Sequence, residues 1–324
     1  MELNLTLYKH LIQTNIAKNL PNSFVEYIGG PLFTSIAELL PFKMNSSVKY
    51  ADMEFKAPWG FASGWADSYK KMEVISSLGA GAVVSKTITY KSKPGNPFPR
   101  FFRWKDHIIN SMGLPNPGLH WWMKELKKHQ SIPEHFIFSI KGNDKQEWRA
   151  LVRGVGQFTN VLELNFSCPN VEAGIIDIPT TISLLRDIRQ NAKNKKLFLK
   201  ISPEYSISAV IDLIQQTKES NIIDGVTCFN TYPVHYKYLG NPLKIGGISG
   251  VPLQHKLFAT VSEIRKKYSS SSELPIFGLG GVWTVLDALR LYKSFDVFPF
   301  VLSAFLIQGP FLFRNWYKSL DKFR

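Results

Sequence analysis

The sequence predicts an α/β protein: a (β/α)8 TIM barrel with a short helical N-terminal extension. Eight short apolar runs bounded by turn residues predict the strands, and segments with helical periodicity alternate with them. The eight repeats take up about 270 residues, which is the usual size of this barrel. A doubly wound sheet also alternates strands and helices, but it does not normally need eight repeats. The 324 residues, 44% of them hydrophobic, are enough for one large core.

Each predicted strand is an apolar run of four to eight residues that Gly, Pro, Asn or Asp bounds. In chain order these runs are 57–62, 80–86, 135–141, 160–166, 196–201, 224–229, 275–279 and 297–303. The segments between and after them repeat apolar residues at helical spacing, as Leu184, Leu185 and Ile188 do. The predicted helices are 67–78, 118–128, 145–156, 181–192, 206–219, 254–267, 283–293 and 311–322.

The first 49 residues do not follow the alternation. Leu5, Tyr8 and Ile12 recur at helical spacing, and a second helical stretch is expected near 33–40. We therefore divide the chain into a helical extension, 1–49, and a (β/α)8 barrel domain, 50–324. An amphipathic extension can pack on the barrel, bind a partner subunit or lie on a membrane surface. Four lysines against three glutamates give little charge for docking to anionic lipid, so membrane association is not favoured.

Composition limits the location and the kinds of site. No apolar run reaches the roughly 18 residues that span a bilayer, and the start of the chain lacks the features of a signal peptide, so we expect a cytoplasmic protein. The two cysteines, Cys168 and Cys228, are too few for a disulfide framework and wrongly spaced for structural zinc. No metal site is predicted, and each thiol is interpreted alone.

The formal net charge of +14 is compatible with nucleic acid, an anionic membrane or an anionic small molecule. Its distribution decides between them. The basic clusters 124–128, 193–196 and 265–267 fall on or beside predicted outer helices, where charge runs are usually solvated. We therefore expect a basic surface and no nucleic-acid partner.

Polar residues gather at the ends of the predicted strands, where the loops of such barrels build the active site. In chain order they are Ser63, Lys86, Thr87, Asn165, Lys200, Asn230 and Thr231. Polar groups at one strand end are often helix caps. Two lysines that end apolar strands are harder to explain in this way, because a buried ammonium needs a partner. Lys86 and Lys200 therefore predict an anionic ligand.

Glycines after the seventh strand suggest a phosphate site. Gly280 and Gly281 precede a helix, and their backbone N–H groups can approach a phosphate closely. Loops after strands seven and eight bind phosphate in many barrels. The other interpretation is an ordinary tight turn. Gly246, Gly247 and Gly250 strengthen the phosphate interpretation.

Cys168 lies in the loop after the fourth strand. A free thiol is most often an inert buried group. At the catalytic end of a barrel, with lysines able to lower its pKa, it is instead a candidate general acid or base. Cys228 lies within the apolar sixth strand, so we interpret it as part of the core. The loops from Tyr90 to Pro117 and after Cys168 are predicted to form a lid that excludes water.

Three longer motifs resemble the dihydroorotate dehydrogenases. They are Gly95-Asn96-Pro97-Phe98-Pro99-Arg100, Asn110-Ser111-Met112-Gly113-Leu114-Pro115-Asn116 and Glu163-Leu164-Asn165-Phe166-Ser167-Cys168-Pro169-Asn170. The resemblance implies an FMN-bound barrel that removes a proton from C5 of (S)-dihydroorotate and passes hydride from C6 to the flavin, giving orotate in de novo pyrimidine (UMP) biosynthesis. Class 1 members use cysteine as the base and class 2 members use serine. Cys168 makes this loop similar to class 1, the archaeal and bacterial catalytic-subunit type.

Carried over residue by residue, the resemblance implies catalytic roles for Cys168 and Lys86. The substrate would contact Lys86, Asn110, Met112, Gly113, Leu114, Asn165, Asn170, Asn230 and Thr231. FMN would contact Ser63, Lys86, Thr87, Asn165, Lys200, Phe229, Gly250, Gly280, Gly281 and Ser303. Asparagine amides can pair with the pyrimidine ring, while lysine offsets the charge of the carboxylate or the reduced flavin.

The chain departs from the class 1 pattern in several places. The helical extension and Phe101-Phe102-Arg103 resemble class 2, in which such an extension approaches the membrane and a quinone. Leu302-Ser303-Ala304-Phe305 stands where the family usually has a Gly-Thr pair for the FMN phosphate, and Thr231-Tyr232-Pro233-Val234-His235 lacks the usual small residues. The electron acceptor therefore stays open between fumarate, a quinone, and NAD reached through an iron–sulfur flavoprotein subunit. The chain has no cysteine cluster for such a centre, which would belong to the partner. A homo-oligomer is expected.

Three other functions are compatible with parts of the sequence. A tRNA-dihydrouridine synthase would use the positive charge, but it needs an RNA-binding domain that we do not expect after the last strand. A dihydropyrimidine dehydrogenase-like reductase is nearer and would bind uracil rather than orotate. A non-catalytic scaffold for partner subunits would not retain FMN.

Overall fold

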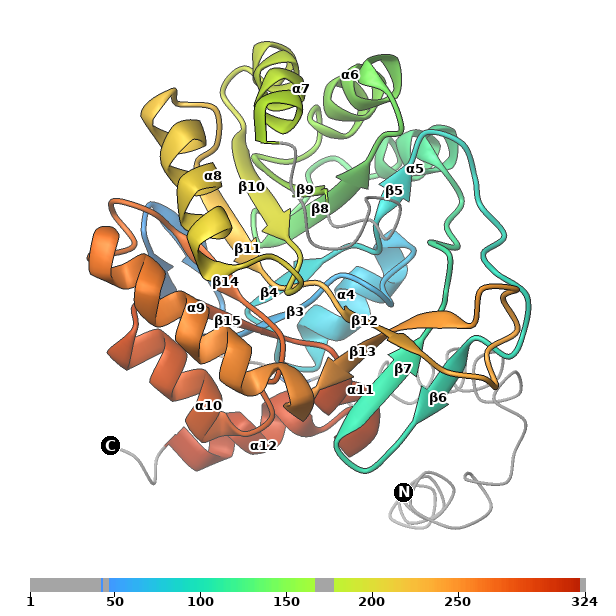
Figure 1. Ribbon diagram of the computed structural model, residues 1–324, viewed down its shortest axis with the longest axis vertical. Helices are drawn as coiled ribbons and strands as arrows, with labels where there is room; N and C mark the ends of the chain where they lie inside the picture. Colours follow the sequence, from blue (N-terminus) through green and yellow to red (C-terminus); the bar gives the residue numbers. More distant parts are fainter. Residues whose placement is uncertain (1–41, 43–46, 167–177, 321–324) are drawn as a thin grey trace.

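The computed structural model describes residue 42 and residues 47–166 and 178–320, and within them eight parallel strands close into a barrel surrounded by helices (Figure 1). The barrel strands are β3 (Gly60–Phe61), β4 (Ala82–Val84), β8 (Phe136–Lys141), β9 (Val161–Asn165), β10 (Lys196–Ile201), β11 (Gly225–Cys228), β14 (Ile276–Gly278) and β15 (Phe298–Val301). Their order around the barrel is β4-β3-β15-β14-β11-β10-β9-β8, and pairing of β4 with β8 closes it. Each predicted strand contains one of these, so the predicted fold is confirmed.

The outer helices follow the predicted periodicity closely. They are α4 (Tyr69–Ser77), α5 (Leu119–Leu126), α6 (Lys145–Val155), α7 (Ile178–Asn191), α8 (Ile207–Glu219), α9 (Gln254–Lys267), α10 (Val285–Leu289) and α12 (Leu312–Leu320). Side-chain caps fix several starts: Asp144 accepts from Glu147 N at 2.9 Å, and Thr284 forms a reciprocal capping box with Asp287. The predicted helix 283–293 divides into α10 and a π-helical turn, η2 (Arg290–Ser294).

Aromatic rings fill the interior of the barrel toward the N-terminal ends of its strands. Phe198 and Phe277 stack with ring centroids 3.9 Å apart, and Phe298 and Phe300 pack beside them. The hairpin β1 (Val48–Tyr50) and β2 (Met53–Phe55) covers this N-terminal end, where the Tyr50 hydroxyl donates to the Ile276 carbonyl at 2.9 Å. The rings and the hairpin close the N-terminal end of the barrel, so a polar site is expected at the C-terminal ends of the strands.

A second, antiparallel sheet was not predicted. It contains β6 (Phe101–Arg103), β7 (His107–Asn110), β12 (Tyr232–His235) and β13 (Ile245–Gly250), in the order β12-β13-β7-β6, and lies at the right of Figure 1. The stretch 90–117, expected as a long loop, therefore contains two paired strands. Strand β5 (Ile88–Thr89) continues the line of β4 along β8. The predicted last strand, 297–303, ends at Val301, and the short helix α11 (Ser303–Gln308) follows it.

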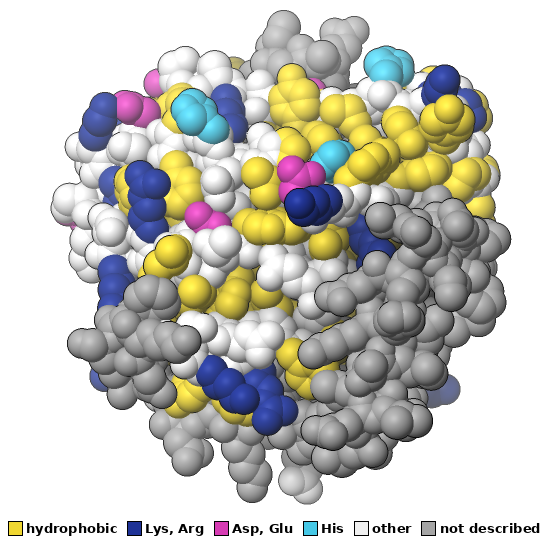
Figure 2. All heavy atoms as spheres, turned by 90° about the horizontal axis from the view of Figure 1, so that it is seen from below, with side chains coloured by type: hydrophobic (Ala, Val, Ile, Leu, Met, Phe, Trp, Pro, Cys, Tyr) yellow, Lys and Arg dark blue, Asp and Glu magenta, His cyan; other side chains and the backbone are white. Residues whose placement is uncertain are grey.

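Aromatic side chains of this sheet and its loops form a cluster in which Trp104 and Tyr238 are exposed. Phe102, Trp104 and Tyr236 pack edge to face or tilted, with centroid distances from 4.8 to 6.3 Å, and Tyr238 adds to them. Figure 2, which views the molecule from below, shows hydrophobic side chains gathered on the upper right of that face, the side on which the sheet lies.

The expected extension, 1–49, lies outside the described residues apart from Phe42 and residues 47–49, the last two of which belong to β1. Phe42 packs against Tyr317 of α12, with ring centroids 5.4 Å apart. In the described part of the chain, no helix has the length and apolar character needed to cross a bilayer.

Candidate active site

A hydrogen-bond network joins residues of β8 and β9 to residues that follow β3 and β4, toward the C-terminal mouth of the barrel. At its centre, the Thr87 hydroxyl lies 3.3 Å from Ser63 Oγ and 3.0 Å from Ser139 Oγ, and accepts from Asn165 Nδ2 at 3.0 Å. Thr87, Ser139 and Asn165 are buried. The structure therefore brings together Ser63, Thr87 and Asn165, which sequence reasoning singled out, and adds Ser139, which it missed.

A buried ion pair lies just below this network. Lys200 Nζ donates to Glu163 Oε1 at 3.2 Å, and the two side chains are only 3% and 2% exposed. Lys200 was expected to face an anion, and here that anion is a carboxylate of the chain itself. Glu163 was quoted only as part of a motif, although a charged residue within the apolar run Val161–Asn165 is a signal that can be read from sequence. The pair sets a fixed charge distribution under any ligand of the mouth.

Two further lysines belong to the same end of the barrel. Lys86 is half-buried where β4 passes into β5, and its backbone N–H donates to the Ala66 carbonyl at 2.7 Å. Lys141, the last residue of β8, is 8% exposed, and its Nζ has no hydrogen-bond partner among the described residues. The Thr227 hydroxyl on β11 is also buried without a partner there. Buried polar atoms that lack protein partners are expected where a polar ligand binds.

The predicted substrate loop follows β7. Its path depends on Gly113 and Leu114, which both take left-handed backbone conformations, with φ of +70° and +55°. Asn116 fixes the end of the loop: its Oδ1 accepts from Gly118 N at 2.9 Å, and its Nδ2 donates to Thr89 Oγ1 at 2.9 Å. Met112 lies within the same turn, half-buried. Asn116 is thus a positioning residue that sequence reasoning did not assign.

The antiparallel sheet connects the substrate loop to the loop after β11. Asn110 Nδ2 donates to the Gly247 carbonyl at 3.3 Å, and Asn110 and Gly247 are partners in the β7–β13 register. A Cβ at Gly247 would overlap the Thr231 hydroxyl, so glycine lets that side chain lie on the sheet. Asn230 Oδ1 accepts from Thr231 N at 2.9 Å. Asn110 and Thr231, far apart in sequence, therefore both contact Gly247.

The glycines predicted to bind phosphate lie on the other side of the mouth. Gly250, Gly280 and Gly281 have φ between +92° and +109°, which side chains rarely adopt. A Cβ on Gly281 would lie 2.5 Å from the backbone N of Gln254, the first residue of α9. Ser303, at the start of α11, donates from Oγ to Ser249 Oγ at 2.9 Å. These bare backbone segments and hydroxyls fit a bound phosphate.

Residues on both sides of the mouth are needed to bind the whole of FMN. The glycine segments suit the phosphate, while Asn165, Lys200 and the Thr87 hydroxyl offer the donors that a flavin ring needs. Phe229, which directly follows β11 and lies beside Gly280, is fully buried. The residues of the mouth are therefore suited to bind FMN.

The structure tests the prediction for Cys228 but not the one for Cys168. Cys228 is a free, fully buried thiol in the core between barrel and helices, and burial raises its pKa to about 12, so the core interpretation is confirmed. Cys168 and Asn170 lie outside the described residues. Their predicted roles stay predictions. Within the described ranges, no group of three or more His, Cys, Asp or Glu residues could hold a metal.

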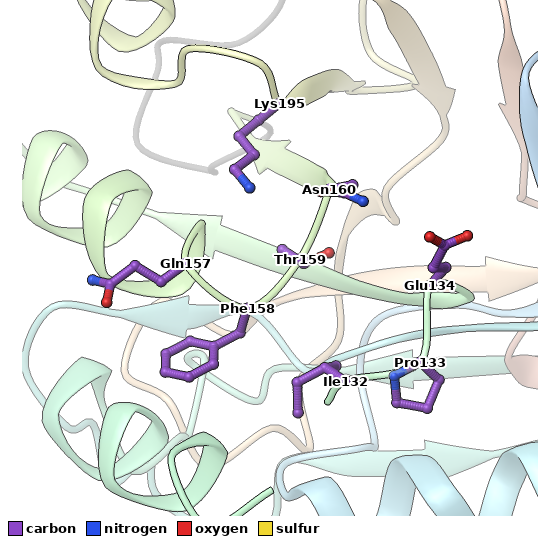
Figure 3. Close-up of a pocket in the computed structure, with 8 residues that line it drawn as sticks. All are labelled: Ile132, Pro133, Glu134, Gln157, Phe158, Thr159, Asn160 and Lys195. Carbon is purple, nitrogen blue, oxygen red and sulfur yellow. The ribbon is translucent and has the colours of Figure 1, made fainter. Parts of the chain in front are cut away.

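A hollow of about 140 Å³ lies at the opposite end of the barrel and does not belong to this site (Figure 3). The residues that line it precede β8, β9 and β10 and include Ile132, Phe158 and Lys195. In this fold, the N-terminal ends of the strands serve stability rather than catalysis.

Comparison with known proteins identifies the family. A family model described as dihydroorotate dehydrogenase matches residues 45–323. The chain is 29% identical over 263 residues to a dihydroorotate dehydrogenase B (NAD(+)) catalytic subunit from Oceanobacillus iheyensis, covering 76% of this chain and 83% of that protein. It is 26% identical over 279 residues to a dihydroorotate dehydrogenase (quinone) from Christiangramia forsetii, covering 81% of each.

Solved structures agree with the sequence relatives. A ligand-free dihydroorotate dehydrogenase from Eimeria tenella superimposes with a TM-score of 0.76 at 25% identity, covering 90% of this chain and 93% of the other. The strand order and the family match point to the same architecture. The chain belongs to the dihydroorotate dehydrogenase family, whose members are FMN-dependent oxidoreductases.

Proposed function

We propose that this protein oxidises (S)-dihydroorotate to orotate in pyrimidine biosynthesis, as a class 1-like enzyme with Cys168 as its base. The observation that carries the proposal is the polar mouth itself, where the Thr87 network, the Lys200–Glu163 pair and the glycine segments converge in a chain of this family. Stacked aromatic rings fill the barrel interior beneath them. Such a site can orient a small, flat, anionic substrate against a flavin.

The cofactor would be held from two sides. Its phosphate would lie against Gly250, Gly280, Gly281 and Ser303, where the glycine backbone has left-handed conformations and carries no side chains. Its ring would lie over the mouth. The ring contacts would be Ser63, Lys86, Thr87, Asn165, Lys200 and Phe229. When bound, FMN accepts the hydride that leaves C6 of the substrate.

The chain's own residues would bind the substrate and move one proton. Amides of Asn110, Asn165, Asn170 and Asn230 pair with the ring N–H and carbonyl groups, with Thr231 beside them. The remaining contacts would come from Lys86, Met112, Gly113 and Leu114. Cys168 Sγ would take the proton from C5, and lysines of the site would stabilise its thiolate form. Asn116, through its bonds to Thr89 and Gly118, would hold the end of the substrate loop in place for these contacts.

The electron acceptor depends on the class. The Oceanobacillus relative is named a catalytic subunit of an NAD(+) type, which supports a second, electron-transferring subunit for this chain. The Christiangramia relative is named a quinone type, which supports direct quinone reduction. The cysteine in the loop after β9 favours the first. Reoxidation of the reduced protein by fumarate, a soluble quinone, or NAD with an added partner subunit distinguishes them.

The test is anaerobic mixing of the FMN-loaded protein with dihydroorotate while the visible flavin absorbance is followed. We expect rapid bleaching, and a slowing of about 10²-fold or more in Cys168→Ala, the usual loss when a general base is removed. Cys228→Ala, which changes a buried thiol outside the mouth, is the matched control and should react at the wild-type rate. Persistent yellow colour with dihydroorotate but bleaching by dihydrouracil or dihydrouridine-containing tRNA would instead favour a dihydropyrimidine dehydrogenase-like or tRNA-dihydrouridine synthase-like reaction.

A further inference from the structure

Lys141 is a buried cation that none of the assigned roles uses. It ends β8, its side chain is 8% exposed, and its Nζ has no hydrogen-bond partner among the described residues. Burial of an ammonium without an anion is strongly unfavourable, so a lysine of this kind implies a ligand of opposite charge. Lys200, the comparable lysine on β10, already has Glu163 as its anion. Lys141 does not.

The alternation of β8 places Lys141 in the mouth. Ile140 packs outward into the core under the helices, whereas Ser139 faces inward and bonds to Thr87. Because side chains alternate along a strand, Lys141 lies on the same face as Ser139, one layer nearer the opening. Strand β8 ends there, and Gly142 packs against Trp148 on the outside. The Nζ is therefore directed to the site and not to solvent.

The strand order shows which part of the ligand Lys141 faces. Around the barrel, β8 is four strands from β14 in both directions, through β4, β3 and β15 on one side and through β9, β10 and β11 on the other. Lys141 is thus diametrically opposite the glycines after β14 that suit the phosphate of FMN. A contact with that phosphate is not compatible with this position.

The substrate loop, by contrast, adjoins Lys141. Lys141 is paired with Thr89 in the β5–β8 register, and Thr89 holds Asn116 through bonds of 2.9 Å and 3.2 Å. Asn116 in turn lies two residues after Leu114, where the substrate loop ends. An anion beside Lys141 is therefore next to the loop that is expected to bind substrate.

We propose that Lys141 is a specificity-determining residue that pairs with the carboxylate of the bound substrate. The assignment rests on the proposed function and deepens it, because it adds a cation for which the carried-over family pattern has no role. A charged carboxylate at the C6 substituent satisfies the buried ammonium, whereas an uncharged pyrimidine leaves it unpaired. Lys141 would thus favour a pyrimidine carboxylate over uracil.

The experiment compares wild type with Lys141→Met, which keeps the length and apolar stem of the side chain but removes its charge. Isothermal titration calorimetry of the FMN-loaded proteins gives the Kd for orotate and for its uncharged amide, orotamide. We expect Lys141→Met to weaken orotate binding by about 10- to 100-fold, the range for losing one hydrogen bond to a charged group, and to leave orotamide within about twofold. Thr260→Val, which removes another buried unpartnered polar atom on α9 outside the barrel, should change neither.

Thermal unfolding without substrate separates this role from a structural one. Lys141→Met should unfold at or above the wild-type temperature, because it removes an unpaired buried charge. A large loss of stability, or equal losses for orotate and orotamide, would overturn the assignment. Unchanged orotate affinity with a lowered flavin midpoint potential would also overturn it, by placing the anion on the reduced flavin. Failure of the wild-type protein to bind orotate would refute the proposed function, and this inference with it.

Discussion

Removal of the Glu163 charge tests the electrostatics of the barrel mouth most directly. Glu163 and Lys200 face each other at 3.2 Å on adjacent strands, both almost completely buried. Glu163→Gln keeps the shape of the side chain and one acceptor oxygen but leaves the Lys200 ammonium without its counter-charge. Breaking a buried pair by removing one partner costs about 3–5 kcal/mol, and a retained neutral hydrogen bond returns about 1 kcal/mol. We expect a loss of about 2–4 kcal/mol in the free energy of unfolding.

The assay is urea unfolding of FMN-free protein, followed by tryptophan fluorescence and far-ultraviolet circular dichroism. FMN is removed because Lys200 is expected to contact it, and coincidence of the two signals checks for two-state behaviour. The double variant Glu163→Gln/Lys200→Met removes both charges and should recover most of the loss, giving a coupling energy of at least about 2 kcal/mol. Glu263→Gln is the control, since its exposed pair with Lys266 contributes about 0–1 kcal/mol. A Glu163→Gln loss no larger than that of Glu263→Gln would refute the view that the pair is buried and unscreened.

Three further predictions test other parts of the structure. Gly281→Ala places a Cβ 2.5 Å from Gln254 at a φ of +92°, so we expect loss of FMN during purification with little change in the circular dichroism spectrum; full retention of the flavin would contradict the assigned phosphate site. Asn116→Ala removes bonds that fix the substrate loop and should lower stability by about 1–3 kcal/mol and weaken orotate binding, which calorimetry measures. Burial, with Lys56 nearby, lowers the pKa of His135 from 6.5 to about 4, so stability should fall as pH drops from 6.5 to 4, and His135→Gln should flatten that dependence in urea titrations between these values; an unchanged slope would show that other groups cause it.

The barrel could be predicted because its strands and helices carry local signals. Each strand is a short apolar run, and α9 has the bounds 254–267 that its periodicity predicts. The antiparallel sheet could not be predicted in this way. Its pairs, such as Gly247 with Asn110, join segments about 140 residues apart, and their register depends on contacts that form only when the barrel has closed.

Arg265 shows a different limit of sequence reasoning. Its position in a basic cluster predicted a solvated side chain, and its neighbours Lys266 and Lys267 are indeed exposed. Arg265 instead turns inward and donates to the backbone carbonyls of Phe295, Leu274 and others between α9 and the next strands. Charge runs give the average environment of a segment, whereas the direction of one side chain depends on the helix face it occupies.

The charged residues of the mouth could nevertheless have been found from the sequence by one rule. Lys141, Glu163 and Lys200 are charged residues within or at the end of strands that are otherwise apolar. Side chains alternate along a strand, so those that share the parity of an inward aromatic or aliphatic residue face the barrel interior, as Lys200 does two residues after Phe198. Had parity been counted from the inward residues, Glu163 and Lys141 would have been found along with Lys200. What parity cannot give is the pairing, because only the closed barrel decides that Glu163 neutralises Lys200 while Lys141 has no partner within the described ranges.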